Sequence, residues 1–144
     1  MKVEDINLIT TDISNFLLIL MGIALSLFTL LYSFILSKKD QLLELSLLIK
    51  LGNKDPLLIQ KQNNALRYIE KLKIFNDKLV VFIVSTFILS FISWFFSKCF
   101  ESLELKYVVV GFYVISFVTI LIIAYFIYIV YLLFKSYIKD TRIK

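Results

Sequence analysis

The chain has 144 residues, of which 60% are hydrophobic and 16% aromatic, with three glycines and one proline. This composition is far more apolar than that of a soluble domain, so it excludes a soluble globular protein and indicates a protein of the lipid bilayer. The formal net charge is +5, there is no histidine, and Cys99 is the single cysteine. An intrachain disulfide, a cysteine-rich metal site and histidine acid–base chemistry are therefore excluded.

No catalytic motif accompanies this composition. The sequence has no hydrolase triad, zinc motif, Gly-rich phosphate loop or dinucleotide fingerprint. We therefore expect a protein that is not an enzyme, with no catalytic residue, bound metal or cofactor. The positive charge is explained by membrane topology and by attraction to anionic lipid headgroups, so nucleic acid is not expected as a primary ligand.

Three uncharged apolar runs define the expected fold. They cover residues 16–36, 79–96 and 107–134, and each meets or approaches the ~20 residues that a helix needs to cross a bilayer. None shows the strict alternation of barrel strands. The segment 1–15 is acidic, and the run that follows it is too long for a cleavable signal peptide. The sequence predicts an all-α integral membrane protein with three transmembrane helices.

The first predicted span carries a stripe of small and hydroxyl residues. Gly22, Ser26, Thr29 and Ser33 follow one another at steps of four, three and four. This is helical spacing, so the four residues share one face of the helix.

Residues 37–78 are predicted to form a cytoplasmic helical hairpin by extension of the first two transmembrane helices. The turn lies at 52–56, where Gly52 can end one helix and Asp55 and Pro56 can begin the next as N-cap and first residue. Before the turn, apolar residues repeat at helical spacing at Leu42, Leu45 and Ile49. After the turn, a heptad pattern consists of Leu58, Gln62, Ala65, Ile69, Leu72, Asn76 and Leu79.

One feature of this hairpin leaves two alternatives open. Gln62 and Asn76 either occupy core positions, where they would help to fix the register, or face solvent. The apolar faces of the two arms are wider than one antiparallel partner can cover, so we expect a homo-oligomer.

The second span repeats the stripe of the first at Thr86, Ser90, Ser93 and Ser97. Matching faces on two helices predict that the first two helices meet along them, because small residues and hydroxyls mediate helix contacts in lipid. The alternative is that one stripe lines a weakly selective, water-filled pore in an oligomer. The spans contain no Asp, Glu, Lys or Arg, which argues against pumps and proton-coupled transporters.

A short outside loop at 97–106 leads to the third span, 107–134, and a basic tail follows at 135–144. The third run has 28 residues, about 42 Å of helix, and must therefore tilt or emerge into the headgroups. Segments 37–78 and 135–144 contain thirteen of the sixteen Lys and Arg residues. The positive-inside rule therefore predicts an outside N-terminus and a cytoplasmic C-terminus.

Four cations around the tip of the hairpin are candidates for a regulatory anionic contact. They are Lys50, Lys54, Lys61 and Arg67. Such a cluster is suited to an acidic soluble partner or a nucleotide signal, although topology and lipid attraction explain the same charges.

A helical hairpin with cytoplasmic arms, Ser/Thr-marked spans and no catalytic residues resembles the small membrane effectors of bacterial anti-phage systems, including the two-span group called SLATT. The resemblance covers residues 14–99 and rests on architecture, and the third span at 107–134 departs from the two-span plan. It implies a pore-former of the bacterial inner membrane, held closed until a partner enzyme's nucleotide product, or the partner itself, releases it.

Two other readings compete with this one. Three spans with an outside N-terminus and a basic tail also resemble class I phage holins, whose loops are generally shorter than the 37–78 segment. The third reading is a non-conducting scaffold or immunity protein whose hairpin docks a soluble partner. We expect a homo-oligomeric effector that permeabilises or depolarises the membrane under regulation.

Overall fold

The chain forms three long helices and, within the described residues, no strand. The computed structural model describes residues 3–51, 55–99 and 104–141. The helices are α1 (Val3–Lys50), α2 (Pro56–Lys98) and α3 (Leu105–Thr141). Each contains a stretch long and apolar enough to cross a membrane, which confirms the prediction of an all-helical chain with three such helices.

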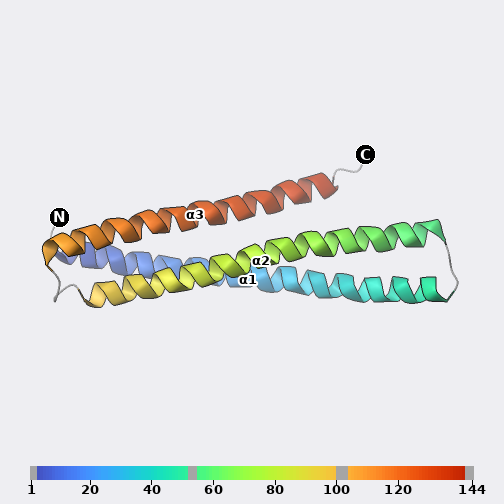
Figure 1. Ribbon diagram of the computed structural model, residues 1–144, viewed down its shortest axis with the longest axis horizontal. Coiled ribbons are helices and arrows are strands. Elements are labelled where there is room, and N and C mark those ends of the chain that lie inside the picture. Colours follow the sequence, from blue (N-terminus) through green and yellow to red (C-terminus); the bar gives the residue numbers. More distant parts are fainter. Residues whose placement is uncertain (1–2, 52–54, 100–103, 142–144) are drawn as a thin grey trace.

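α1 and α2 form an antiparallel hairpin along which α3 lies (Figure 1). The beginning of α1, the end of α2 and the beginning of α3 lie together at one end of the molecule. The tip of the hairpin lies at the other end, beyond the C-terminal end of α3. α3 is close to the hairpin where it begins and diverges from it toward its C-terminus.

The hairpin turn follows the sequence prediction where the structure describes it. Asp55 has φ −62° and ψ 122°, and its Oδ1 accepts a hydrogen bond of 2.9 Å from the backbone N–H of Leu57. Pro56 occupies the first helical position, where no N–H is needed. The predicted N-cap is therefore confirmed, whereas Gly52 lies outside the described residues.

The contact between α1 and α2 is one continuous heptad seam. Positions spaced alternately by three and four residues are buried or half-buried along nearly the whole of both helices, as in an antiparallel coiled coil. On α1 they are Ser14, Leu17, Met21, Ala24, Phe28, Leu31, Ile35, Lys38, Leu42, Leu45 and Ile49. On α2 they are Leu58, Gln62, Ala65, Ile69, Leu72, Asn76, Leu79, Ile83, Thr86, Ser90, Ser93 and Ser97. The heptad predicted for the α2 arm is confirmed and continues into the predicted span.

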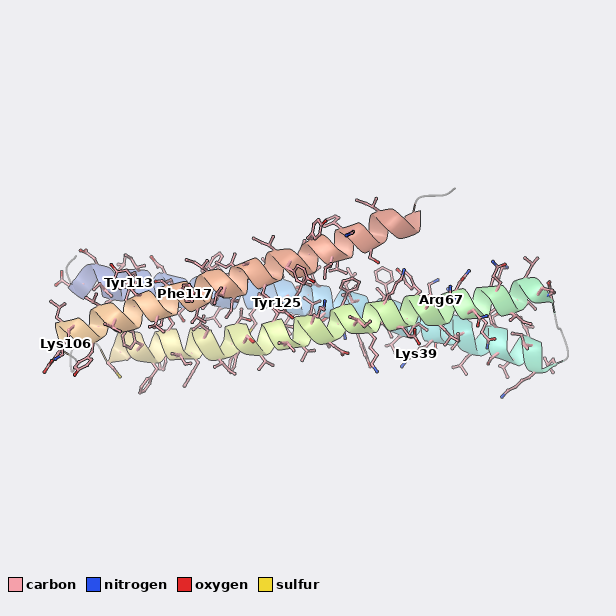
Figure 2. All side chains as sticks on the ribbon, turned by 45° about the horizontal axis from the view of Figure 1, so that its top comes forward. Lys39, Arg67, Lys106, Tyr113, Phe117 and Tyr125 are labelled. Carbon is pink, nitrogen blue, oxygen red and sulfur yellow. The ribbon has the colours of Figure 1, made fainter. Side chains whose placement is uncertain are left out.

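Two clusters of apolar side chains join α3 to this hairpin. Ile129 of α3 is fully buried in a cluster with Ala24 and Leu79, and the Phe82 and Phe126 rings stack at 4.8 Å between centroids. Tyr125 lies between α3 and the hairpin (Figure 2) and packs against the same cluster.

A second cluster closes the end where the N-terminus lies. There Val108 of α3 is buried against Ile6 of α1. The Phe96 ring lies directly over Gly111, where a Cβ atom would clash with it. The absence of a side chain at Gly111 therefore permits the approach of α2 and α3.

α1 begins well before the first predicted span. Residues 3–15 are helical, and Ile6, Thr10 and Ser14 are buried in contact with other helices. No glycine or proline interrupts this segment, so the helix continues through the predicted boundary at 15/16. The membrane boundaries themselves remain predictions.

The register of the hairpin offsets the first two predicted spans. Ser97, at the end of the uncharged part of α2, donates a hydrogen bond to Asn7 Oδ1. Asn7 precedes the predicted start of the first span, Phe16, by about nine residues, roughly 13 Å of helix. At the other end, Lys78 lies level with Tyr128, its Nζ 5.4 Å from the ring centroid. The uncharged residues of α1 and α3 therefore extend farther toward the hairpin tip than those of α2.

Most of the apolar surface stays uncovered by the chain itself. Of the most apolar 18-residue stretch of each helix, 22% is buried in α1, 33% in α2 and 11% in α3. Apolar surface of this extent is compatible with a multi-pass membrane protein, in which a bilayer would cover it.

Candidate functional site

The stripe of α2 lies in the seam, where its serines bond to the first turns of α1. Ser14 Oγ and Ser90 Oγ lie 3.1 Å apart, and each hydroxyl is also 3.1 Å from the backbone carbonyl oxygen of the other residue. One turn away, Ser93 Oγ donates to the Thr10 carbonyl oxygen at 3.0 Å. All four residues are buried.

Ser97 continues these contacts toward the end of the hairpin. Its Oγ donates to Asn7 Oδ1 and lies 3.1 Å from Thr11 Oγ1. Thr86, at the other end of the stripe, is buried but donates to the Phe82 carbonyl oxygen of its own helix at 2.7 Å. We call the interhelical set the polar seam; it comprises Asn7, Thr10, Thr11, Ser14, Ser90, Ser93 and Ser97.

The α1 half of the polar seam was missed by the sequence analysis, which assigned residues 1–15 to an outside segment. A signal for it exists, because Asn7, Thr10 and Ser14 follow one another at steps of three and four, as the α2 stripe does. A search for hydroxyl spacing beyond the uncharged run would have found it.

The stripe of α1 has a different setting. Gly22, Ser26, Thr29 and Ser33, which we call the outer stripe, are all exposed. The prediction that it meets the α2 stripe is wrong within this chain. The seam positions of α1 include Ala24 and Leu31, two residues from the outer stripe; at 3.6 residues per turn this is a rotation of about 200°. The outer stripe therefore points away from α2.

The hydroxyls of the outer stripe bond to their own helix. Ser26, Thr29 and Ser33 donate to carbonyl oxygens four residues earlier at 3.0, 2.9 and 3.0 Å. Each oxygen keeps accepting capacity directed outward. Among the described residues, no atom of a neighbouring side chain or helix would come within 4 Å of a Cβ atom at Gly22. The outer stripe is thus an open strip along which a helix or water can approach the α1 backbone closely.

The three candidate cations that the structure describes do not line one groove. Lys50, Lys61 and Arg67 are exposed, and Lys54 lies outside the described residues. Lys61 lines a groove of about 510 Å³ between the two arms, which Lys38 also lines and Lys50 and Arg67 do not. Figure 2 shows Arg67 on the α2 arm, near the level at which α3 ends.

A larger groove of about 640 Å³ lies where α3 diverges from the hairpin. We call it the three-helix groove. Its walls come from α1 between Leu27 and Phe34, from α2 between Tyr68 and Phe75, and from α3 between Val130 and Ser136. The sequence analysis gave no sign of this groove, because it depends on the path of α3.

Within the part of the chain that the structure describes, no three His, Cys, Asp or Glu side chains gather closely enough to hold a metal ion. A scan against protein-family models and searches of curated proteins and of solved structures found no match to this chain. What the molecule presents is a hairpin held by the polar seam, an outer stripe open to neighbours, and a groove beneath α3.

Proposed function

We propose that the chain is a homo-oligomeric membrane effector that permeabilises or depolarises the inner membrane of a bacterium when a soluble partner or a nucleotide signal releases it. The observation that carries this proposal is the outer stripe, a row of small and hydroxyl residues that α2 and α3 leave exposed on a helix of apolar residues. A role in anti-phage defence follows from the architectural resemblance to membrane effectors of such systems.

The proposed topology has an outside N-terminus and a cytoplasmic C-terminus. Thirteen Lys and Arg residues lie in segments 37–78 and 135–144, against three in the rest of the chain. The fold supports this separation, because Asn7 and Ser97 meet at one end of the hairpin, while the basic arms form the other end.

We place the inner surface of the hydrocarbon core about one helical turn beyond Lys78 and Tyr128, near Phe75 and Tyr131. Because Ser14 lies level with Ser90, a core of ~30 Å then holds residues 75–94 of α2 and 10–29 of α1, with Gly22 and Ser26 inside it and Asp12 and Lys78 near its two surfaces. The remaining uncharged residues of α1 and α3 enter the headgroup region on the cytoplasmic side. Lysines at this level can extend their ammonium groups toward water.

Oligomerisation through the outer stripe supplies the route for permeation. Lipid gives no hydrophobic drive between apolar helices, so small residues and hydroxyls are the groups through which α1 helices of neighbouring copies can pack. If the copies surround a common axis, the hydroxyls line a weakly selective path with Phe and Leu side chains as hydrophobic gates. The alternative is that the α1 helices pack together without forming a path for ions. The experiment below distinguishes these two possibilities.

A second candidate function is a non-conducting scaffold that docks a soluble partner through the hairpin. The observation that favours it is the exposure of Leu43, Leu47, Leu51 and Leu57 on the arms, beyond the proposed membrane surface. Apolar side chains exposed there indicate a protein contact. In the effector proposal the same surface receives the regulator.

The test is inducible expression in a bacterium that carries a potential-sensitive dye. The native chain is compared with Ser26→Leu, which blocks the outer stripe, and with Ser85→Leu as the matched control, since Ser85 also donates to its own helix, to Val81 at 2.8 Å, but lies off the stripe. A fourth variant lacks residues 42–48 and 58–64, one heptad from each arm. It tests whether the arms hold the proposed pore closed, and the removal of whole heptads keeps the seam in phase.

The effector is supported if the native or the shortened chain depolarises the membrane. Ser26→Leu should then reduce the depolarisation in protein that still oligomerises, and Ser85→Leu should leave it unchanged. The scaffold is favoured if all four chains are present in the membrane and none changes the membrane potential, while the arms retain a soluble protein. Equal depolarisation by all variants removes the outer stripe from the route.

A further inference from the structure

The three-helix groove lies where α3 diverges from α1 and α2 toward its C-terminus (Figure 1). Ile129 is fully buried, and none of the described side chains of α3 beyond it is buried. The opening that results is about 640 Å³, which is within the range of small-molecule and lipid-chain sites. It begins just past Lys78 and Tyr128, which contact each other at 5.4 Å.

The lining of the groove changes character along the helix axes. At the end nearest Lys78, the walls are Leu27, Phe75 and Val130, one from each helix and all apolar. At the far end they include Tyr68, Lys71 and Ser136, which are the polar side chains of the lining. No acidic side chain of the described residues lines the groove.

Further cations surround the polar end. Lys38 Nζ lies 5.9 Å from the centroid of the Tyr68 ring, and Lys135 Nζ lies 6.0 Å from that of Tyr131. With Lys71, three cations therefore lie at or beside this end of the groove. An occupant that fits must therefore be apolar toward the membrane and anionic toward the hairpin arms.

We propose that the groove holds an acyl chain of an anionic phospholipid from the cytoplasmic leaflet, with the lipid phosphate at Lys71 and Tyr68. A lipid of that leaflet has its chains directed to the membrane centre and its phosphate to the cytoplasm, the same direction as the change from Leu27 to Tyr68. Basic pockets between helices on the cytoplasmic side are recurrent sites for such lipids. The inference rests on the membrane placement of the proposed function, and not on conduction.

The experiment uses tryptophan quenching by brominated acyl chains in vesicles that contain the full chain. Phe134 lines the groove, so Phe134→Trp in a Trp94→Phe chain reports on its occupant. Dibrominated phosphatidylglycerol or dibrominated phosphatidylcholine is added as a minor fraction of phosphatidylcholine vesicles. In the otherwise native chain, Trp94, which is exposed on α2, reports membrane insertion by the same quenching.

Stronger quenching of the Phe134→Trp chain by the phosphatidylglycerol, with an apparent affinity about fivefold higher than for phosphatidylcholine, is the expected result. Lys71→Gln should remove this preference. Lys73→Gln should keep it, because Lys73 is exposed on the same helix and does not line the groove.

Three results overturn the proposal. If the two lipids quench equally while Trp94 is quenched normally, the groove contacts the surrounding lipid without preference for an anionic headgroup. Quenching of Trp94 but not of the Phe134→Trp chain means that protein, such as a second copy, covers the groove. Absence of Trp94 quenching removes the membrane placement and the lipid site with it, whereas a loss of ion flux alone leaves the lipid site intact.

Discussion

Ser90 and Ser26 belong to the same small-polar pattern and have opposite surroundings. Ser90 Oγ is buried and reaches Ser14 on another helix, whereas Ser26 Oγ is exposed and reaches the Gly22 carbonyl oxygen of its own helix. A hydroxyl that joins two helices contributes to tertiary stability, and one that returns to its own backbone does not.

Ser90→Ala should therefore lower the free energy of unfolding by about 0.6 kcal/mol, the average for hydrogen bonds between membrane helices, and by no more than about 1.7 kcal/mol, the largest value measured. Ser26→Ala, at an exposed site, should change it by less than about 0.5 kcal/mol. Denaturant unfolding of the purified chain in detergent, followed by circular dichroism, compares the two. Equal losses at both positions would show that the polar seam does not hold the hairpin.

Asn76 is a buried polar residue of the heptad seam between α1 and α2. It is 8% exposed, and its Oδ1 has no hydrogen-bond partner among the described residues. Of the two readings that the sequence left open, the core position is the one found. A buried amide of this kind lowers stability and favours one register over others.

Asn76→Leu should raise the free energy of unfolding by about 1 to 3 kcal/mol, because it removes an unsatisfied acceptor and adds apolar contact. The register should become less unique as a result. Unfolding in detergent measures the first effect, and disulfide trapping between cysteines placed at Ser14 and Ser90 measures the second. A loss of stability would mean that Asn76 has a partner in the assembled protein.

At the scale of elements, the α2 heptad could be predicted and the α1 seam could not. The arm of α2 alternates apolar and charged positions, so Leu58, Ala65 and Leu72 identify its buried face. Within the apolar run of α1 every face is hydrophobic, so periodicity does not distinguish the face that meets protein from the face that meets lipid. Small residues were the remaining signal, and α1 carries them on two faces, at Ala24 and at the outer stripe.

The close approach of α2 and α3 at Phe96 depends on a single glycine. The Phe96 ring occupies the space that a side chain at Gly111 would take, and Val108 one turn earlier is buried. Any substitution at Gly111 must displace the ring or the helix.

Gly111→Ala should therefore destabilise the chain by about 1 to 3 kcal/mol, as overpacking does elsewhere. Adding Phe96→Leu should restore part of the loss, with a coupling energy of about 0.5 to 3 kcal/mol. A double-mutant cycle of unfolding free energies measures this coupling, and strictly additive losses would place the two residues out of contact.

At the scale of the whole molecule, the offset of the helices along their axes determines which surfaces of the chain remain exposed. The presence of three long helices could be predicted from the sequence, but their register depends on contacts such as Ser97 with Asn7 and Lys78 with Tyr128, which join residues far apart in the chain. The outer stripe and the three-helix groove both result from that register. This is why neither could be placed from composition or spacing alone.

If copies meet along the outer stripe, cysteines placed there should cross-link between chains. In a Cys99→Ser chain, Ser26→Cys and Ser33→Cys are expected to form disulfide-linked dimers in native membranes. Ile120→Cys, at a site of α3 that is 63% exposed, serves as the comparison. Electrophoresis without reductant measures the dimer fraction; dimers at Ile120→Cys only would assign the interface to α3.

Ion flux through vesicles that contain only the purified chain tests the central claim, permeation along the outer stripe, most directly. The account predicts that the chain shortened by one heptad in each arm releases a trapped ion, that Ser26→Leu in that chain reduces the release severalfold, and that Ser85→Leu leaves it unchanged. Vesicles that stay tight with the shortened chain assembled in them, or release that Ser26→Leu does not alter, would contradict it.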